Sequence, residues 1–221
     1  MSSRRLPANV VHFYKEERMS DKESRMKNYR IQREAMLDAG YQEYVGTISI
    51  LKANLWALAT AGPFAVLAAV IYLAKWGVGS ISVSFGGMVL FLLLFVISIP
   101  VHEGLHGLTW GICCRNHFKS IRFGIMKDSG TPYCHCMEPL RFGSYLAGDL
   151  MPFLLLGIVL FFISLFMHSF LLLMLSVINI LCAGGDTTIA LMLLRYRDAE
   201  ILDHPTDCGF VAFRKEKGRK N

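Results

Sequence analysis

Long apolar stretches dominate the chain from residue 51 to residue 195, whereas residues 1–50 and 196–221 are polar and charged. A helix needs roughly 20 apolar residues to cross a bilayer, and four stretches reach about that length. We expect spanning helices at about Asn54–Ala74, Val83–Cys113, Leu146–Phe166 and Phe170–Leu194. The pattern predicts an all-α membrane protein with about four transmembrane helices.

Prolines and one short loop refine this picture. Gly62-Pro63 predicts a kink in the first span. The second span is longer than a bilayer requires, so it must tilt, break near Pro100 or extend beyond the membrane. Only Met167-His168-Ser169 separates the last two spans, which predicts an antiparallel helical hairpin.

Charge gives the expected orientation. Ten Lys and Arg residues precede the first span, one lies in the next loop, five lie between the second and third spans, and seven follow the fourth. The positive-inside rule therefore places both termini and the middle loop in the cytoplasm. This arrangement accounts for the net charge of +6 without a nucleic-acid partner. Together with 53% hydrophobic residues, it predicts a multi-pass integral membrane protein.

The middle loop has a different pattern. Ile121, Phe123 and Ile125 alternate with other residues, and a turn-forming Asp128-Ser129-Gly130 follows. This pattern predicts a short β-hairpin on the cytoplasmic side, between the second and third spans. Its strand could hold an extended peptide by edge pairing; a plain connecting loop is the alternative.

The two ends of the chain carry no recognisable chemistry. Residues 1–50 form a basic, cytoplasmic segment, in which Tyr14–Ala39 predicts an amphipathic surface helix lying on anionic headgroups. A solvated regulatory or partner-binding helix is the alternative. Residues 196–221 form a basic cytoplasmic tail, and we expect Arg214–Asn221 to be disordered.

The second predicted span contains the sequence His102-Glu103-Gly104-Leu105-His106. Imidazoles at positions i and i+4 lie on one face of a helix and can share a tetrahedral zinc ion. Glu103 stands beside them, where it can take a proton from a water molecule on the metal. Ionisable groups inside a span are expensive and typical of functional sites. The alternative is a histidine pair that only packs helices, which leaves Glu103 unexplained.

A catalytic zinc ion needs a third protein ligand at the same membrane depth. His102 lies about 28 Å past the outer end of the second span, at about 1.5 Å per residue. Asp186 lies about 24 Å along the fourth span, which runs in the same direction. It is the only acidic residue inside that span and follows Gly184-Gly185, which allow close approach of another backbone. We therefore expect Asp186 to be the third ligand; a hydrogen-bonded aspartate without metal is the alternative.

Other polar residues are weaker candidates. Asp149, near the start of the third predicted span, is expected to cap a helix N-terminus. His117 and His135, in the middle loop, would be ligands only if the loop folded back. His168 lies at the wrong side of the membrane, and His204 is expected to support a turn.

The cysteines fit a reducing compartment. Five of the six fall in segments expected to be cytoplasmic, where disulfides are rare. Cys113-Cys114 and Cys134-His135-Cys136 do not have standard zinc-knuckle spacing, so buried thiols are a simpler explanation than a structural zinc site.

The motif in a span, the Gly-Thr-Pro-Tyr run of the hairpin and an aspartate two spans later together resemble the site-2 protease clan of intramembrane zinc proteases. Over about Pro100–Phe210 the chain is similar to a family of bacterial and archaeal membrane proteins called putative zincin peptidases. The resemblance implies His102, His106 and Asp186 as zinc ligands, Glu103 as general base and a bacterial or archaeal cell membrane as location. Site-2 proteases usually carry an Asn-Pro-rich stretch before an Asp-Gly pair. That stretch is missing here, which puts the alignment of a substrate strand in doubt more than metal binding.

Residues 51–195 thus form a metalloprotease-like core, and the chain is expected to be an intramembrane zinc metallopeptidase. Its expected partners are the lipid bilayer and a membrane-protein or peptide substrate, whose identity stays open with the oligomeric state. One alternative is a non-catalytic metal-binding or pseudoprotease scaffold that binds a partner helix. Another is haem binding through His102 or His106, which needs a histidine inside another span that the sequence lacks.

Overall fold

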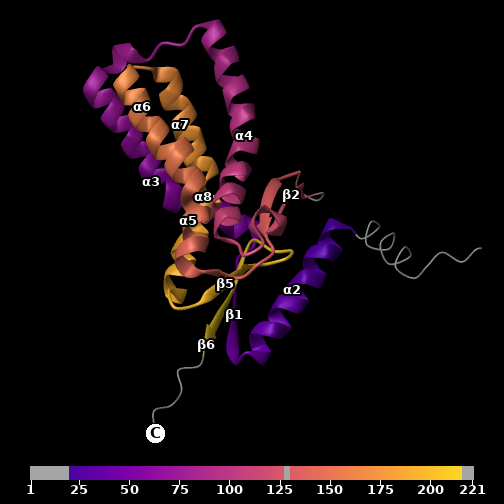
Figure 1. The fold of residues 1–221 in the computed structure, drawn as a ribbon. Helices are drawn as coiled ribbons and strands as arrows, with labels where there is room; N and C mark the ends of the chain where they lie inside the picture. The colour runs from indigo at the N-terminus through magenta and orange to yellow at the C-terminus, as the bar shows by residue number, and fades with distance from the viewer. Residues whose placement is uncertain (1–19, 127–129, 216–221) are drawn as a thin grey trace, which may run out of the picture.

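The computed structural model of the protein describes residues 20–126 and 130–215 (Figure 1). It is mostly helical, with two small antiparallel sheets at one end of a helix bundle. The helices are α2 (Asp21–Asp38), α3 (Ile50–Trp76), α4 (Phe85–Cys113), α5 (Phe142–Pro152), α6 (Leu160–Met167), α7 (Phe170–Cys182) and α8 (Gly184–Leu193), with short helical turns η1 (Val78–Ser80), η2 (His117–Ser120), η3 (Phe153–Val159) and η4 (Leu194–Tyr196). The strands are β1 (Tyr41–Thr47), β2 (Ile121–Ile125), β3 (Pro132–Cys136), β4 (Leu140–Arg141), β5 (Glu200–Asp203) and β6 (Gly209–Lys215).

Three helical segments of the described chain are long and apolar enough to cross a membrane: Leu51–Trp76, Phe85–Cys113 and Phe142–Met167. The pair Phe170–Cys182 and Gly184–Tyr196 is bent by 45° and gives a fourth if it counts as one span. These segments overlap the four stretches that the hydrophobic pattern predicted. The helices are therefore those of a membrane protein with three or four spans.

Two irregular turns lie where the sequence did not predict them. α3 is one helix through Pro63, where the kink stays a prediction, and α4 is one helix through Pro100, so the break considered there does not occur. A proline removes one hydrogen bond, and the surrounding turns can keep the helix intact. The irregular turns follow Pro152, where η3 is a π-helix, and Ala183, where α7 and α8 meet.

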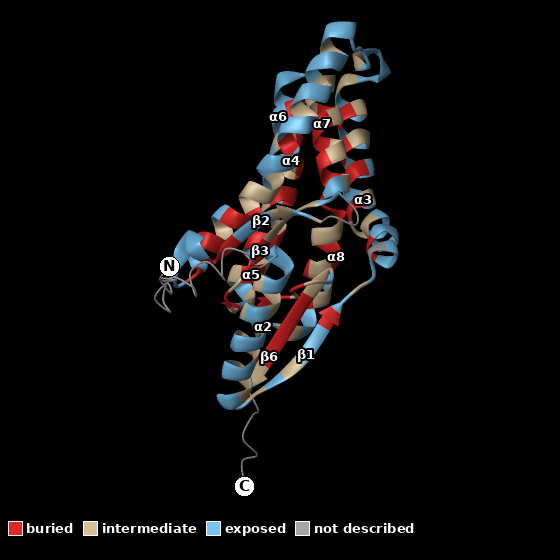
Figure 2. Ribbon diagram, turned by 90° about the vertical axis from the view of Figure 1, so that its right-hand side faces the viewer, coloured by how far each residue is buried: buried red, intermediate tan, exposed pale blue. Residues whose placement is uncertain are grey.

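The apolar surface of the bundle faces outward. Figure 2 shows buried residues on the inner faces of the helices and exposed residues on their outer faces. Of the three long apolar segments, α4 is the least packed, because 6% of its most apolar stretch is buried, against 22% in α3 and 28% in the α5–α6 segment. Large apolar side chains such as Phe85 and Leu92 are exposed on it. An exposed apolar surface of this extent is expected where lipid covers a helix.

A four-stranded sheet lies below the bundle, in the order β1-β6-β5-β4, with each neighbouring pair antiparallel (Figure 1). β1 pairs with β6 over seven residues, from Tyr41 opposite Lys215 to Thr47 opposite Gly209. The all-α expectation is therefore incomplete, and part of the segment interpreted as a basic tail is a strand. β6 contains Phe210–Phe213, which is buried throughout. Residues 216–221 lie outside the described residues.

α2 is the described part of the predicted N-terminal helix. The residues of that prediction before Ser20 lie outside the described residues. Ser20 and Glu23 form a capping box at its start. None of its residues is buried, but Tyr29 and Met36 pack on the apolar side of the four-stranded sheet. The helix thus contacts the chain's own sheet, while its predicted contact with lipid headgroups stays a prediction.

The second sheet pairs β2 with β3, from Ile121 opposite Cys136 to Ile125 opposite Pro132. These strands lie in the segment where the sequence predicted a hairpin, although residues 127–129 of the turn are outside the described residues. Both strands contact α4 near its C-terminal end. The sheet thereby brings β3 close to the helix that carries the histidine motif.

Candidate metal centre

α4 and α8 place the predicted site residues. His102, Glu103 and His106 follow one another within the C-terminal half of α4. Asp186 is the third residue of α8, directly after the bend at Ala183. Gly184 allows this start of α8 to lie against α3, because a Cβ atom there would come within 2.5 Å of the Cβ of Ala57. The bend and the close approach set the position of Asp186.

The structure brings His102, His106 and Asp186 together. The Nε2 atoms of the two histidines are 3.2 Å apart. Nε2 of His102 is 3.2 Å from Oδ2 of Asp186, and Nε2 of His106 is 3.7 Å from its Oδ1. In the described part of the chain, this is the group of His, Cys, Asp or Glu residues whose ligand atoms lie close enough, within 4.8 Å, to hold a metal ion.

These spacings fit a zinc ion. Ligands at about 2.0–2.1 Å in tetrahedral geometry lie about 3.3 Å from one another, close to the separations found here. Oδ2 of Asp186 is buried and has no hydrogen-bond partner among the described residues, as expected for an atom that binds a cation. Two imidazoles and a carboxylate also form a donor set typical of catalytic zinc, with a fourth position left for water.

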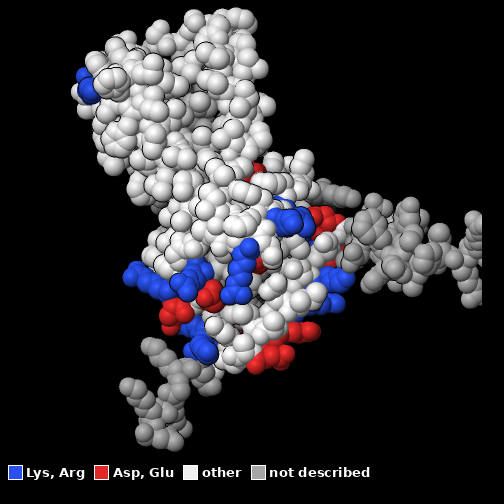
Figure 3. Space-filling view, viewed as in Figure 1, with Lys and Arg blue, Asp and Glu red and all other residues white. Residues whose placement is uncertain are grey.

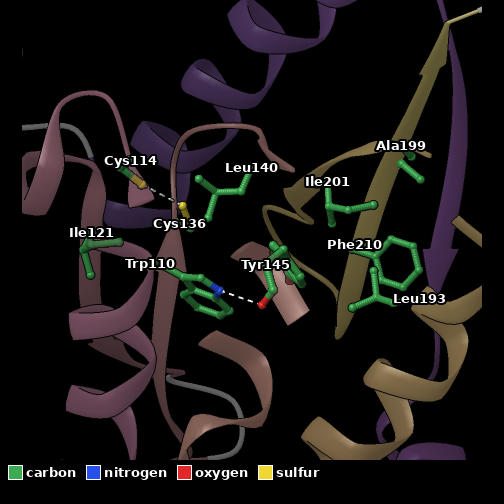
Figure 4. Packing of buried hydrophobic residues seen from close by; sticks show 11 residues of the cluster. Trp110, Cys114, Ile121, Cys136, Leu140, Tyr145, Leu193, Ala199, Ile201 and Phe210 are labelled. Atoms are coloured by element: carbon green, nitrogen blue, oxygen red, sulfur yellow. Dashed lines mark hydrogen bonds between the residues drawn. The ribbon is translucent and has the colours of Figure 1, made fainter. Parts of the chain in front are cut away.

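His106 is oriented by the neighbouring helix α5. Its Nδ1 atom lies 2.8 Å from the carbonyl oxygen of Gly148. A carbonyl can only accept, so Nδ1 donates and Nε2 presents its lone pair toward Asp186. Trp110 stacks on the other side of the ring at 5.2 Å and donates from Nε1 to the carbonyl oxygen of Tyr145 (Figure 4). These contacts fix the orientation of the imidazole, as a hydrogen bond to the other ring nitrogen does for histidines that bind metal ions.

The three residues line a cavity of about 280 Å³. Glu103 lines it, together with residues of α5, α8 and β3 and of the loop between β5 and β6. The cavity therefore has room for a reacting group beside Glu103. His102, Glu103 and His106 of the sequence motif and the predicted third ligand, Asp186, therefore line the same cavity.

Comparison of the sequence with known protein families identifies the same region. The model of a family described as "Putative zincin peptidase" matches residues 95–201. The match contains His102, Glu103, His106 and Asp186. It begins before Pro100 and ends before Asp203, so it is shifted toward the N-terminus relative to the likeness expected from the sequence. No curated protein and no solved structure matches the chain.

The weaker candidates lie in different places. Asp149 is the eighth residue of α5, which begins at Phe142, so its predicted role as a helix cap is wrong. Its side chain instead lines the cavity. His204 also lines the cavity, and its Nδ1 accepts a hydrogen bond from the backbone of Asp207, which agrees with the predicted turn.

The remaining histidines do not join the three residues. His117 lies in η2, outside the cavity. His168 ends α6 and stacks on Trp76 at 4.0 Å, away from the cavity. His135 lines the cavity but is buried against Asp203, 3.6 Å away. Burial lowers the pKa of His135 to about 3, and the nearby Arg25 acts in the same direction.

Asp203 and Tyr145 are site residues that the sequence analysis missed. Both line the cavity, and the Tyr145 hydroxyl donates to Asp203. Asp203 also accepts a hydrogen bond of 2.7 Å from the backbone of Cys136. Burial raises the pKa of Asp203 to about 6, while these two hydrogen bonds oppose the rise. The Asp-His-Pro run at residue 203 was the signal that could have found it.

The cysteine group is no second metal site within the residues that the structure describes. All six cysteines are free, as expected. Cys114 and Cys136 are buried with their Sγ atoms 3.4 Å apart and link the end of α4 to β3 (Figure 4). Cys134 lines the main cavity, and burial raises the pKa of its thiol. The prediction of buried thiols therefore holds for Cys114 and Cys136, whereas Cys113 is exposed and Cys134 is partly buried.

Proposed function

We propose that the chain is an intramembrane zinc metallopeptidase that hydrolyses a peptide bond in or next to a membrane segment. One observation carries this proposal: His102 and His106 of α4 converge with Asp186 of α8 in a cavity that Glu103 also lines. The matched family description supports a metallopeptidase. The three convergent residues would hold the ion.

The chemistry assigns a part to each residue. When bound, a zinc ion polarises a carbonyl group and makes a water molecule acidic near neutral pH. His102, His106 and Asp186 would hold the ion. The carbonyl oxygen of Gly148 keeps His106 in the tautomer that can bind it. Glu103 takes a proton from the attacking water and later passes it to the amine that leaves. Each proton removed from water is thus returned to the product.

The position of the site favours a substrate inside the membrane. A second cavity, of about 190 Å³, shares His102, Glu103 and Cys182 with the first. It continues between α4 and α7, where Phe95 and Ile99 line it one to two turns before His102. This cavity leads from the site toward the apolar part of the bundle. It supports approach of a substrate from the lipid side.

Strand β3 supports binding of an extended peptide. Its residues Pro132–His135 line the main cavity, and within the described chain it pairs in a ladder with β2 alone. Part of its other edge is already used, because the backbone of Cys136 donates to Asp203 and that of Cys134 to Glu103. An extended segment would add to the remaining part by main-chain hydrogen bonds. Extension matters because a helical substrate keeps its carbonyl groups in hydrogen bonds.

The charge distribution supports an orientation with both termini in the cytoplasm. Figure 3 shows Lys, Arg, Asp and Glu gathered at the end of the molecule that carries the sheets. At the opposite end of the bundle, α3 finishes with Lys75. β1 and β6 pair with each other, so the two ends of the described chain lie on the same side. The positive-inside rule assigns that side to the cytoplasm.

The test combines metal analysis with a cleavage assay on detergent-purified full-length protein. We expect near-stoichiometric zinc in the wild type, loss of zinc in His102→Ala and Asp186→Ala, and retained zinc in the control His117→Ala. Glu103→Gln should keep zinc and lose at least about 100-fold in cleavage of a membrane-segment substrate, since general acid–base catalysis typically contributes that much. Wild-type cleavage by Glu103→Gln would refute the proposed role, and zinc without any cleavage would favour a non-catalytic scaffold.

A further inference from the structure

Asp149 is a buried carboxylate with an oxygen that no described residue contacts by a hydrogen bond. Its side chain is 3% exposed and lines the main cavity from α5. Its Oδ2 atom has no hydrogen-bond partner, and no ion pair of Asp149 occurs among the described residues. A carboxylate buried in this way is costly unless a cation or a donor reaches it. The group therefore needs a partner that the described residues do not supply.

The other carboxylates of the cavity are accounted for. They are Glu103 in the proposed proton transfer, Asp186 beside the two histidines, Asp203 with hydrogen bonds from Tyr145 and Cys136, and Asp207 with an ion pair to His204. Among the described residues, one guanidinium lines the cavity, that of Arg25, which is 3.2 Å from Asp21 and lies over the ring of Tyr133. It pairs with Asp21, so the described part of the chain places no counter-charge at Asp149.

The missing partner is not the proposed metal ion. The ligand atoms of His102, His106 and Asp186 form one compact group, and Asp149 is not part of it. Asp149 nevertheless lies next to Gly148, whose carbonyl oxygen contacts His106. A cation bound to Asp149 would therefore lie near the reacting bond, yet separate from the metal.

We propose that Asp149 binds the ammonium or guanidinium group of a lysine or arginine next to the bond that is cleaved. This specificity rests on the proposed function, since it assigns a substrate class to the same cavity. Membrane segments carry Lys and Arg preferentially where they enter the cytoplasm. The cavity is lined by β3 and by the loop between β5 and β6, and Figure 3 shows charged residues gathered at the end of the molecule that carries the sheets. Asp149 is thus a residue that selects the substrate, distinct from the residues that cleave it.

The test measures binding apart from turnover. Two labelled peptides share one apolar sequence and differ at one position beside the central amide, which holds lysine in one and norleucine in the other. Their affinities are measured by fluorescence anisotropy on zinc-loaded Glu103→Gln protein. We expect the lysine peptide to bind at least about tenfold more tightly, because charge-assisted hydrogen bonds in buried sites reach this size.

The same ratio is then measured after a second substitution. Adding Asp149→Asn should reduce the preference for lysine to less than about threefold. Adding Asp207→Asn is the matched control, because it removes an equal charge from an exposed residue of the same cavity and should leave the preference intact.

Three outcomes would overturn the proposal: equal affinity for both peptides, a preference that survives Asp149→Asn, or loss of a metal equivalent in that variant. A lysine preference that depends on Asp149, in a wild-type protein that cleaves neither peptide, would support the binding site and refute the peptidase function. Failure of the two proposals is therefore distinguishable.

Discussion

Nδ1 of His106 donates to the carbonyl oxygen of Gly148 across the contact between α4 and α5. Only a residue without a side chain allows this approach. A Cβ atom at Gly148 would lie 2.2 Å from the indole of Trp110, which is buried and held by its own hydrogen bond to Tyr145. The orientation of the imidazole therefore depends on a glycine in another helix.

Gly148→Ala should weaken zinc binding. The added methyl group must push α4 and α5 apart, which lengthens the His106–Gly148 hydrogen bond. Loss of a hydrogen bond that orients a metal-binding histidine typically costs about 10–100-fold in metal affinity. Competition with a zinc chelator measures this. Gly143→Ala is the control on the same helix, because its methyl group meets nothing within 4 Å; equal affinities in both variants would contradict the argument.

Two adjacent glycines of α8 give a second matched pair. A Cβ atom at Gly184 would come within 2.5–3.0 Å of side-chain and backbone atoms of Ala57, whereas one at Gly185 meets nothing within 4 Å. Backbone cannot rotate away, so Gly184→Ala should displace the first turn of α8 and Asp186 with it. We expect a lower melting temperature and loss of zinc in Gly184→Ala alone. Comparable zinc content in the two purified variants would show that this contact does not position Asp186.

The local part of the site could be predicted from the sequence. The spacing of His102 and His106 places both imidazoles on one face of a helix wherever that helix lies in the fold. Asp186 followed from depth, because two spans that run in the same direction bring residues of similar distance from the membrane surface to one level. Neither argument needed knowledge of the contacts between helices.

The rest depends on where helices begin and on long-range pairing. The apolar pattern suggested that the third span starts at Leu146, but α5 starts at Phe142, which moves Asp149 from a helix end into the cavity. The four-stranded sheet joins β1 to β6, from opposite ends of the described chain. Short strands carry little periodicity of their own, so their pairing appears only in the folded chain.

Removal of zinc should destabilise the protein. Oδ2 of Asp186 is buried and has no hydrogen-bond partner among the described residues, and Nε2 of each histidine lies within 3.7 Å of its carboxylate. A ligand that binds only the folded state stabilises it by about 2.7 kcal/mol at a free concentration 100 times its Kd. Thermal unfolding in detergent, after chelation and again after zinc is restored, should show a reversible shift of several degrees. His102→Ala should show no such shift, and a response equal to that of the wild type would exclude this site as its source.

The histidine of β3 should make stability depend on pH. The pKa of His135 is lowered to about 3 in the folded protein, against about 6.5 in an unfolded chain. Between these values the unfolded chain binds a proton that the folded protein does not, so this residue lowers the free energy of unfolding as the pH falls, by up to about 1.4 kcal/mol per pH unit. Asp203 acts in the opposite sense, because its pKa is raised to about 6 and the folded protein holds its proton more tightly between about pH 4 and that value.

His135→Gln isolates the first effect. The variant keeps Asp203 but no longer has a group that must stay neutral in acid. Its melting temperature relative to the wild type should therefore rise steadily as the pH is lowered from 7 to 5. At pH 8 the imidazole is neutral in both states, so any difference there reports packing alone and serves as the baseline. A difference that stays constant over the whole range would mean that His135 can take up a proton in the folded protein, and that the buried environment assigned to it beside Asp203 is wrong.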